Sequence, residues 1–356
     1  MSDDSPANVR LSVDGAAVII IDQTLLPNET VFLELREPDE LFEAISVLRV
    51  RGAPAIGIFA AFALYVHART VAARSSGCDS LVNGSLVTES LVTEILRFGA
   101  HLRSARPTAV NLAKQLSRME SLAISLAGSS VSRVLDALRN EAITIQREDA
   151  DMCRAISEYG LTLIRDGAGI LTHCNAGPLA TSLYGTGLGT ILLARERGIH
   201  LRVYCDETRP LLQGARLTVY ELMNAGVDCT LICDNMASIV MQEGKIDAVF
   251  VGCDRVARNG DAANKIGTSG VAILAKHYNI PFYVFCPSST IDRECETGAG
   301  IVIEQRPPRE IAEMYFEKPI APEGVKCYNP AFDVTDNSLI TAIITEGGIH
   351  RAPYSF

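Results

Sequence analysis

Tryptophan is absent from this chain of 356 residues, and aromatic residues make up only 6% of it. Aliphatic side chains must therefore supply most of the core, and 48% of the residues are hydrophobic. No run of lysine or arginine stands out, and the formal net charge is −10. This balance argues against nucleic acid or an anionic membrane surface as the main partner.

Several targeting and metal signals are also missing. The ten cysteines contain no CxxC pair and several lie inside apolar runs, which favours reduced thiols over a disulfide framework. The six histidines lack ligand spacing, so no metal site is predicted. The N-terminus lacks the basic segment of a signal peptide, and the longest apolar stretch, residues 53–66, is predicted to be too short to span a membrane. We therefore expect a cytoplasmic protein.

Nucleotide-binding motifs are lacking as well. The chain has no Walker A sequence, and its glycine-rich stretch Tyr184-Gly-Thr-Gly-Leu-Gly189 does not have the GxGxxG spacing. This stretch also does not lie between a strand and a helix in the required order. We therefore predict that these glycines allow close packing of a helix on a sheet, rather than binding of a dinucleotide.

The pattern of strands and helices changes near residue 130, where Gly128-Ser-Ser-Val-Ser132 is typical of a linker. Short strands are predicted within residues 10–36, followed by a helix starting at Pro38 and further helices, one of them opened by Pro107 and Thr108. After the linker come a long polar helix and then alternating strands and helices. The sequence thus predicts an α/β protein: a small mixed strand-plus-helix N-terminal domain (residues 1–130), then a connecting helix and a Rossmann-like parallel-sheet domain (residues 131–356).

The predicted strands of the second domain are apolar runs that end in polar residues. Such runs suit strands buried on both faces of a parallel sheet. The candidate strands are residues 170–172, 201–205, 229–233, 248–252, 282–285 and 301–303. Polar clusters follow the first five, at residues 173–175, 206–209, 234–235, 253–255 and 287–290. Open α/β sheets bind ligands at the carboxyl ends of their strands, so these clusters predict a site.

The first cluster contains the strongest candidate, Cys174, in Gly169-Ile-Leu-Thr-His-Cys-Asn-Ala-Gly-Pro178. Pro178 is predicted to open a helix, which would place the thiol at the positive end of a helix dipole and lower its pKa. A small buried hydrophobic role is the alternative for any cysteine. The polar neighbours at a strand end favour a functional role here.

A second candidate, Asp254, ends a strand after several apolar residues. A partly buried carboxyl has a raised pKa and can donate a proton near neutral pH. Gln213, at a predicted helix start, is suited to a sugar hydroxyl. Asn264 and Lys265 precede another helix start, a position suited to phosphate.

Two arginines are candidates for phosphate binding, although each has a structural alternative. Arg51 lies in Val50-Arg-Gly-Ala-Pro-Ala-Ile-Gly57, which fits either a phosphate cradle or a turn between helices. Arg106 precedes a predicted helix start, where it fits either a phosphate clamp or a solvated side chain. A thiol, a carboxylic acid and a few cations together suggest proton transfer on a sugar phosphate.

Read together, these stretches closely resemble the methylthioribose-1-phosphate isomerase family over nearly the whole chain. The matching stretches are Val50–Gly57, Arg106–Asn111, Thr172–Gly177, Glu207–Thr218, Asn259–Thr268, Asn329–Thr335 and Leu339–Glu346. The resemblance implies conversion of an aldose 1-phosphate into a ketose 1-phosphate, as in methionine salvage, by a cofactor-free homodimer. It also implies a small N-terminal domain and a Rossmann-like domain that binds no dinucleotide.

The resemblance also assigns residues. Cys174 matches the family's catalytic cysteine and Asp254 matches its proton donor. The substrate-binding positions are matched by Arg51, Gly52, Ala53, Arg106, Gln213, Asn264 and Lys265.

Three residues depart from the family pattern. In the family, alanine is common at the position of Cys253, an aromatic residue at that of Ser269, and proline at that of Asp336. The first two lie close to the expected site, so a 5-deoxyribose 1-phosphate isomerase, or an enzyme that accepts both substrates, is an alternative. The family also resembles regulatory subunits of a translation-initiation nucleotide-exchange factor. A non-catalytic subunit that binds a phosphate ligand is therefore the alternative from another class.

Overall fold

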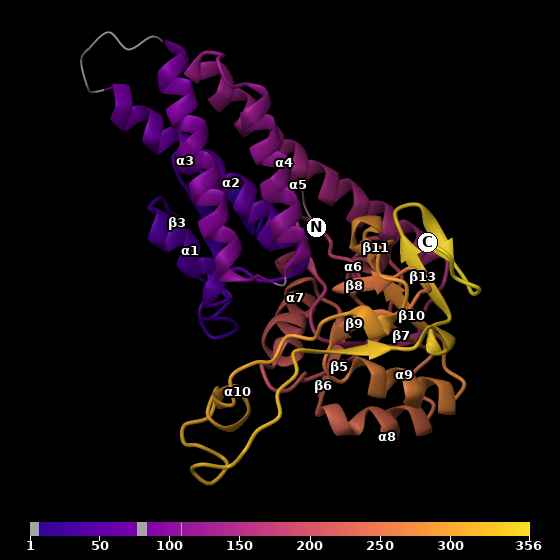
Figure 1. Cartoon of the computed structure of the whole chain (residues 1–356). Helices are drawn as coiled ribbons and strands as arrows, with labels where there is room; N and C mark the ends of the chain where they lie inside the picture. The colour runs from indigo at the N-terminus through magenta and orange to yellow at the C-terminus, as the bar shows by residue number, and fades with distance from the viewer. Residues whose placement is uncertain (1–6, 77–83, 108) are drawn as a thin grey trace. The chain divides into compact units, whose positions relative to one another are not determined.

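The computed structural model describes residues 7–76, 84–107 and 109–356, which form two compact units (Figure 1). The N-terminal unit runs to Asp151 and also includes Leu179–Ser182. The sheet unit contains Met152–Pro178 and Leu183–Phe356. The expected domain boundary near residue 130 stays a prediction. A long helix starts there, at Val131, and the sequence passes from one compact unit to the other within that helix, after Asp151.

The N-terminal unit combines a three-stranded antiparallel sheet, ordered β1-β2-β3, with long helices. Its elements are β1 (Val9–Leu11), β2 (Val18–Ile21), β3 (Phe32–Leu35), α1 (Pro38–Ser46), α2 (Ala53–Ser76), α3 (Gly84–Ala105), α4 (Val110–Ser125) and the first part of α5 (Val131–Leu161). Helix α1 begins at Pro38 as predicted, because Glu37 and Glu40 form a capping box there. Helix α4 begins later than predicted: Pro107 lies in a turn and Thr108 is outside the described residues.

Helix α2 is the central core helix of the N-terminal unit. The prediction that its apolar stretch is too short to span a membrane was wrong about length, since Ala53–Arg74 is long and apolar enough. However, 83% of its most apolar window is buried inside the protein. Phe59 and Phe62 are fully enclosed, and α3 and α4 pack against the helix. Its apolar character therefore serves the core of the N-terminal unit.

The sheet unit is built on a seven-stranded sheet ordered β14-β13-β10-β7-β4-β5-β6. Its strands are β4 (Gly169–His173), β5 (Arg202–Asp206), β6 (Asp228–Ile232), β7 (Ala248–Val251), β10 (Phe282–Phe285), β13 (Ala342–Thr345) and β14 (Gly348–His350). All neighbours pair in parallel except β13 and β14. The parallel-sheet prediction is confirmed, but the described residues 301–303 are not in a strand, and Val302 is 77% exposed.

Helices cover both faces of this sheet. Ile170 and Phe250 pack with the end of α5 and with α6 (Gly189–Glu196) and α7 (Val219–Asn224). Leu171 and Val249, the next residues along the same strands, pack with α8 (Ala237–Gln242) and α9 (Thr268–His277). Figure 1 shows α8 and α9 side by side against their face. Since successive side chains alternate between faces, a strand covered on both sides must be apolar throughout.

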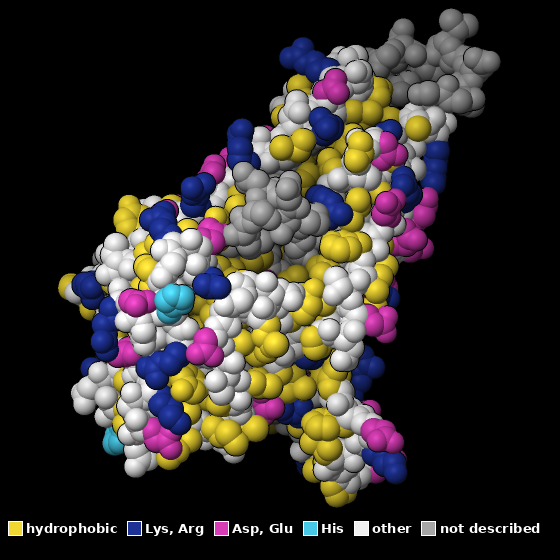
Figure 2. Space-filling model, turned by 180° about the vertical axis from the view of Figure 1, so that it is seen from behind, with side chains coloured by type: hydrophobic (Ala, Val, Ile, Leu, Met, Phe, Trp, Pro, Cys, Tyr) yellow, Lys and Arg dark blue, Asp and Glu magenta, His cyan; other side chains and the backbone are white. Residues whose placement is uncertain are grey.

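A four-stranded sheet, ordered β11-β8-β9-β12, was not predicted. Its strands are β8 (Arg255–Ala257), β9 (Ala262–Lys265), β11 (Ile291–Asp292) and β12 (Phe332–Thr335). Between β11 and β12 the chain makes a long excursion that carries α10 (Arg309–Ala312) and projects at the lower right of Figure 2. This excursion exposes Tyr315, Phe316, Ile320, Val325 and Tyr328.

Asp261, between β8 and β9, joins three loops of this sheet. Its carboxylate accepts hydrogen bonds from Asn259 Nδ2 at 2.9 Å, Gly298 N at 2.9 Å, and Asn337 N and Nδ2 at 2.9 and 2.8 Å. Burial acts to raise the pKa of Asp261, but these hydrogen bonds outweigh it and lower that pKa from its usual value. The ionised form is therefore the one that stabilises the fold.

We expect Asp261→Asn to lower the free energy of unfolding at pH 7 by about 2 kcal/mol, because the amide nitrogen that replaces one oxygen leaves two of the four donors without an acceptor. A carboxyl with a lowered pKa stabilises the fold above its unfolded pKa and loses that effect as the pH falls through its folded pKa. The difference between wild type and variant should therefore shrink below about pH 4. Urea unfolding from pH 7 to 3.5 would measure it, with exposed Asp151→Asn as control; a difference independent of pH would contradict this account.

Candidate active site

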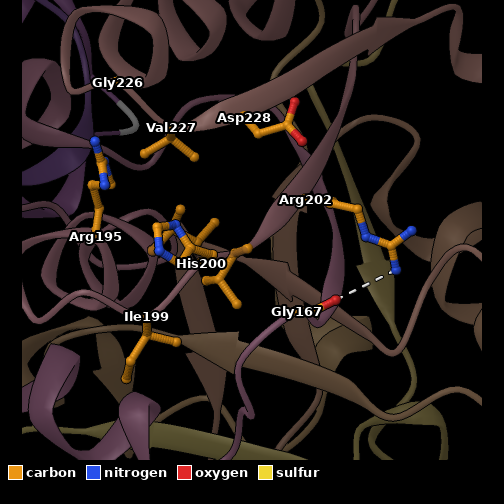
Figure 3. Close-up of a pocket in the computed structure, with 10 residues that line it drawn as sticks. Gly167, Arg195, Ile199, His200, Arg202, Gly226, Val227 and Asp228 are labelled. Carbon is orange, nitrogen blue, oxygen red and sulfur yellow. Dashed lines mark hydrogen bonds between the residues drawn. The ribbon is translucent and has the colours of Figure 1, made fainter.

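A pocket of about 290 Å³ lies at the amino ends of β4, β5 and β6 (Figure 3). Arg195, His200, Arg202 and Asp228 surround its apolar wall, and Arg202 Nη2 donates a hydrogen bond to Gly167 O at 3.4 Å. The polar clusters predicted as the site follow the carboxyl ends of the same strands. Because the strands are parallel, those clusters share the opposite edge of the sheet, and we place the candidate site there.

Cys174 directly follows β4 and is buried, with a backbone φ of +66°. Its N–H donates to Thr208 Oγ1 at 2.8 Å, and its carbonyl accepts from Thr218 Oγ1 at 2.6 Å. Thr208 itself has a φ of +65°. Left-handed conformations are uncommon for residues with a side chain and collect at functional sites, where surrounding contacts hold them. The hydroxyls of Thr208 and Thr218 hold the left-handed backbone of Cys174 in place.

We expect Cys174→Gly to have a free energy of unfolding about 1 kcal/mol higher than Cys174→Ala, because alanine retains the Cβ that a left-handed backbone disfavours. The same pair of substitutions at Cys205, inside β5, is the control, and there alanine should be the more stable variant. Chemical unfolding of the four variants would measure both differences. A more stable alanine variant at position 174 would show that the backbone there carries no strain.

The predicted helix at Pro178 is wrong. The chain forms a single 3₁₀ turn over Pro178–Ala180, and the next α-helix, α6, begins at Gly189. The helix dipole that was predicted to act on the Cys174 thiol is therefore not formed at Pro178. The reason is long-range packing: Leu179–Ser182 belongs to the N-terminal unit, and the chain then folds back at Gly185, where a Cβ would lie 2.4 Å from Ala176 O.

The glycine-rich stretch 184–189 has the predicted packing role. A Cβ on Gly187 would lie 3.0 Å from Gly252 N, and one on Gly189 would lie 2.3 Å from Ser157 Oγ in α5. These glycines therefore let the chain approach β7 and α5 closely.

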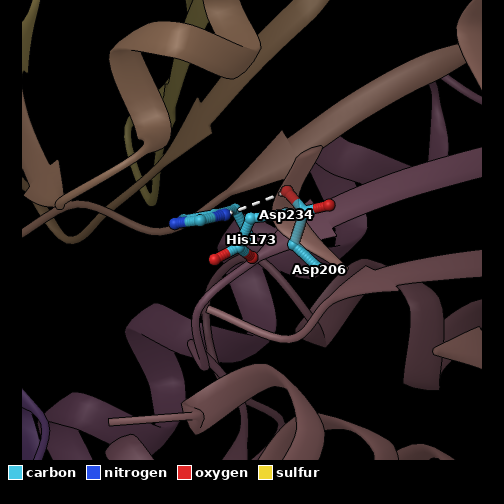
Figure 4. A group of neighbouring side chains, drawn as sticks. All are labelled: His173, Asp206 and Asp234. Atoms are coloured by element: carbon cyan, nitrogen blue, oxygen red, sulfur yellow. Dashed lines mark hydrogen bonds and ion pairs between the residues drawn. The ribbon is translucent and has the colours of Figure 1, made fainter. Parts of the chain in front are cut away.

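His173 and Asp206 form a buried pair at the ends of β4 and β5 (Figure 4). His173 Nδ1 lies 2.9 Å from Asp206 Oδ2, and His173 Nε2 lies 2.8 Å from Ile266 O. Burial acts to lower the pKa of His173, but the hydrogen bond and charge of Asp206, with the charge of Asp234, outweigh it and raise that pKa. Burial also raises the pKa of Asp206. Both raised pKa values favour retention of a proton between His173 Nδ1 and Asp206 Oδ2.

Asp234 lies close to His173 and Asp206, and side chains of these kinds can bind metal ions. Their possible ligand atoms all lie within 4.8 Å of one another. One imidazole and two carboxylates are ligands that can bind a divalent cation. However, Asp234 accepts from Thr208 N and Arg209 N, both at 2.7 Å, while both nitrogens of His173 face other acceptors. The hydrogen bonds of Asp234 therefore fix the loop after β5, while the buried Asp206 Oδ1 has no hydrogen-bond partner among the described residues.

Asp254 follows β7, the strand that pairs with β4, and His173 lies opposite Val251 in that pairing. Cys174 and Asp254 thus follow the ends of two neighbouring parallel strands. Asp254 is half-buried, and its N–H donates to Ala263 O at 3.0 Å. The adjacent Cys253 has its Sγ 3.2 Å from Arg255 O and Ala263 O, and burial raises its pKa well above the usual value. Cys253 is a structural thiol beside the candidate acid.

Three predicted substrate-binding side chains lie in the sheet unit. Gln213 is 5% exposed, and its Oε1 has no hydrogen-bond partner among the described residues. Such a buried acceptor needs a donor from elsewhere, and a ligand hydroxyl would supply one. Asn264 Nδ2 donates to Thr268 Oγ1 at 3.1 Å. Lys265 Nζ donates to Ala331 O at 3.0 Å and lies 4.5 Å from the ring centre of Phe332.

The remaining predicted residues lie in the N-terminal unit. Arg51 and Gly52 precede α2, which begins at Ala53. Arg51 Nε donates to Gln23 Oε1 at 3.2 Å, and a Cβ on Gly52 would lie 2.5 Å from Ala180 Cα. The Arg51 turn therefore both connects two helices and offers a helix N-terminus suited to an anion. Arg106 directly follows α3 and is half-buried.

The structure adds residues that the sequence analysis did not assign. Thr208 and Thr218 fix the backbone of Cys174, and Asp206 holds His173. Thr208 and Asp206 stood within a predicted polar cluster, which was a usable signal. Thr218 lies in a π-helical turn, Gly214–Thr218, and only the fold brings it to Cys174.

Comparisons with known proteins give a consistent relationship. Residues 49–352 match the Initiation factor 2 subunit family. The chain is 59% identical over 347 residues to a methylthioribose-1-phosphate isomerase of Symbiobacterium thermophilum, covering 98% of this chain and 93% of that protein. It is 54% identical over 346 residues to a 5-deoxyribose 1-phosphate isomerase of Petrotoga mobilis, covering 97% and 96%.

Solved structures share the fold along the whole chain. The 5-methylthioribose 1-phosphate isomerase from Pyrococcus horikoshii is 38% identical with a TM-score of 0.89, covering 99% of this chain and 94% of that one. A translation initiation factor eIF-2B subunit delta from A. fulgidus is 42% identical with a TM-score of 0.86, covering 98% and 97%. The predicted α/β architecture agrees with both.

Proposed function

Because the chain belongs to the Initiation factor 2 subunit family and matches sugar 1-phosphate isomerases over nearly all its length, we propose that it isomerises an aldose 1-phosphate to a ketose 1-phosphate. The leading substrate is 5-methylthioribose 1-phosphate, converted to 5-methylthioribulose 1-phosphate in methionine salvage. The structural observation that supports this best is a thiol and a carboxyl at the ends of neighbouring strands, Cys174 after β4 and Asp254 after β7.

The chemistry explains why these two groups are needed. Phosphate on the anomeric carbon prevents spontaneous opening of the sugar ring to a free aldehyde. Protonation of the ring oxygen assists opening, and Asp254 is the proposed acid. A hydrogen must then move from C2 to C1. Cys174 either takes and returns it as a proton through an enolate, or shapes and stabilises the site while a hydride shifts directly.

Substrate binding is proposed for residues that match the family positions. In the sheet unit these are Gln213 for a sugar hydroxyl, where the unsatisfied Oε1 supports the assignment, and Asn264 and Lys265 for phosphate. In the N-terminal unit they are Arg51, Gly52, Ala53 and Arg106. The start of α2 supports the first three, since backbone N–H groups at a helix N-terminus bind anions.

The 5-substituent of the sugar is the open part of the substrate assignment. The 54% identity to a 5-deoxyribose 1-phosphate isomerase favours that compound as the second candidate, or a dual substrate range. Cys253, next to the proposed acid, and Ser269, in the first turn of α9, are the departures nearest the site. The likeness to an eIF-2B subunit delta keeps a regulatory, non-catalytic subunit as the alternative from another class.

Three further properties are part of this proposal: a homodimer, a cytoplasmic location and activity without a cofactor or metal. Turnover is expected to be unaffected by EDTA. Loss of activity in EDTA that an added divalent metal restores would overturn the metal-free assignment.

The deciding experiment compares kcat/KM of the purified protein for 5-methylthioribose 1-phosphate, 5-deoxyribose 1-phosphate and ribose 1,5-bisphosphate. Ketose formation from the first at the highest kcat/KM is the expected result. A higher value for the second would reassign the substrate. Folded protein that binds these sugar phosphates without converting any of them would support the regulatory alternative.

A further inference from the structure

His173 belongs to one element and contacts two others near the proposed catalytic thiol. It is the last residue of β4 and precedes Cys174. Its Nδ1 faces Asp206 on β5, and its Nε2 faces the carbonyl of Ile266, in the turn between β9 and α9. That turn follows Asn264 and Lys265 directly. The imidazole therefore connects the thiol-bearing strand end to the residues proposed to bind phosphate.

The hydrogen bonds place a proton on each side of the ring, one toward Ile266 O and one between Nδ1 and Asp206. A carbonyl oxygen only accepts, so Nε2 must carry a hydrogen toward Ile266. Nδ1 faces a carboxylate oxygen at 2.9 Å, and two lone pairs would repel there unless a proton lies between them. Three carboxyl groups act on the ring: Asp206, Asp234 and Asp333. A cationic imidazolium balances this acidic surrounding better than a neutral ring does.

The turn rests directly on the imidazole ring. Gly267 has a φ of +105°, and a Cβ there would lie 2.8 Å from His173 Cε1. Asp333 accepts from Gly267 N at 2.8 Å and from Ser269 N at 3.1 Å. The turn is thus held by both an acidic and a basic side chain.

We propose that His173 is a positioning residue for the isomerase reaction: held as an imidazolium by Asp206, it fixes the Ile266–Gly267 turn relative to Cys174. This role rests on the proposed function. Displacement of a reacting group by about 1 Å costs on the order of a hundredfold in rate, so such an anchor acts on kcat. His173 itself does not exchange the substrate's protons.

The test replaces His173 with glutamine, whose two amide hydrogens share one nitrogen and so cannot replace donors at two separate ring nitrogens. We expect kcat for 5-methylthioribose 1-phosphate to fall about thirtyfold to a hundredfold, with KM changed less than about threefold. Asp206→Asn keeps the ring and removes the charge, so a smaller fall in kcat is expected. The matched control is His67→Gln, a buried histidine in α2 of the N-terminal unit, which should keep the wild-type kcat.

Nitrogen-15 NMR of the histidine rings tests the same role without substrate. Wild-type His173 should show both nitrogens protonated at pH 7, and Asp206→Asn should lower the pH at which Nδ1 loses its proton. A neutral ring in the wild type at pH 7, or an unchanged kcat in folded His173→Gln, would overturn the positioning role alone. No turnover of any of the three sugar phosphates by the wild type would instead overturn the proposed function, and the catalytic role of His173 with it.

Discussion

Replacing Cys174 with serine is expected to lower kcat by two to four orders of magnitude, the usual range for removing a proton-transfer group. The side chains are nearly the same size, and the hydrogen bonds that hold residue 174 use its backbone. The fold should therefore be retained. A serine hydroxyl has a far higher pKa than a thiol, so it cannot take and return the hydrogen of C2 at a useful rate.

The control for this substitution is Cys205→Ser, which makes the same change at a buried thiol on the neighbouring strand β5. Its folded form should keep the wild-type kcat. Turnover of the wild type in deuterated water would separate the two routes, because an enolate exchanges hydrogen with solvent and a direct hydride shift does not. Near-normal kcat in Cys174→Ser would remove the cysteine from the mechanism.

Asp254→Asn is expected to lower kcat by about two to three orders of magnitude while KM changes only a few-fold. Asparagine has almost the same shape and leaves the backbone bond to Ala263 in place, but it cannot protonate the ring oxygen. The loss should therefore fall on the chemical step. Steady-state kinetics with 5-methylthioribose 1-phosphate would measure both constants.

Asp228→Asn is the matched control, since Asp228 begins β6 at the opposite edge of the sheet. It should leave both constants unchanged. If Asp254→Asn instead raised KM and left kcat intact, Asp254 would be a ligand-positioning residue rather than the acid.

The sequence predicted β4, β5, β6, β7 and β10 of the large sheet but not β13 and β14. The central strands were found because burial on both faces leaves a strong local signal. Ile170 and Leu171 in β4 and the apolar run Ala248–Val251 in β7 both lie in central strands. The polar residues after them meet at one edge because parallel strands end on the same side. This explains how Cys174 and Asp254 could be chosen without a structure.

The failures arise where long-range contacts override the local pattern. Proline followed by apolar residues is typical of a helix start, yet Leu179–Ser182 packs in the N-terminal unit instead. Strand β9 is only Ala262–Lys265, and its partner β12 lies far along the chain at Phe332–Thr335. The link between His173 and Ile266 depends on this small sheet, so no local pattern could have revealed it.

The allocation of Leu179–Ser182 to the N-terminal unit also has a consequence for synthesis on the ribosome. Asn8 Nδ2 and Gln23 Nε2 both donate to Leu179 O at 2.8 Å, and Asp149 accepts from Ser182 N at 2.8 Å. These donors and acceptors are translated before their partners, and β4 emerges between them. The N-terminal unit therefore cannot complete its hydrogen bonds until the first strand of the next unit has left the exit tunnel. Completion of the N-terminal unit therefore overlaps with the emergence of the first strand of the sheet unit, while the sheet still lacks its later strands.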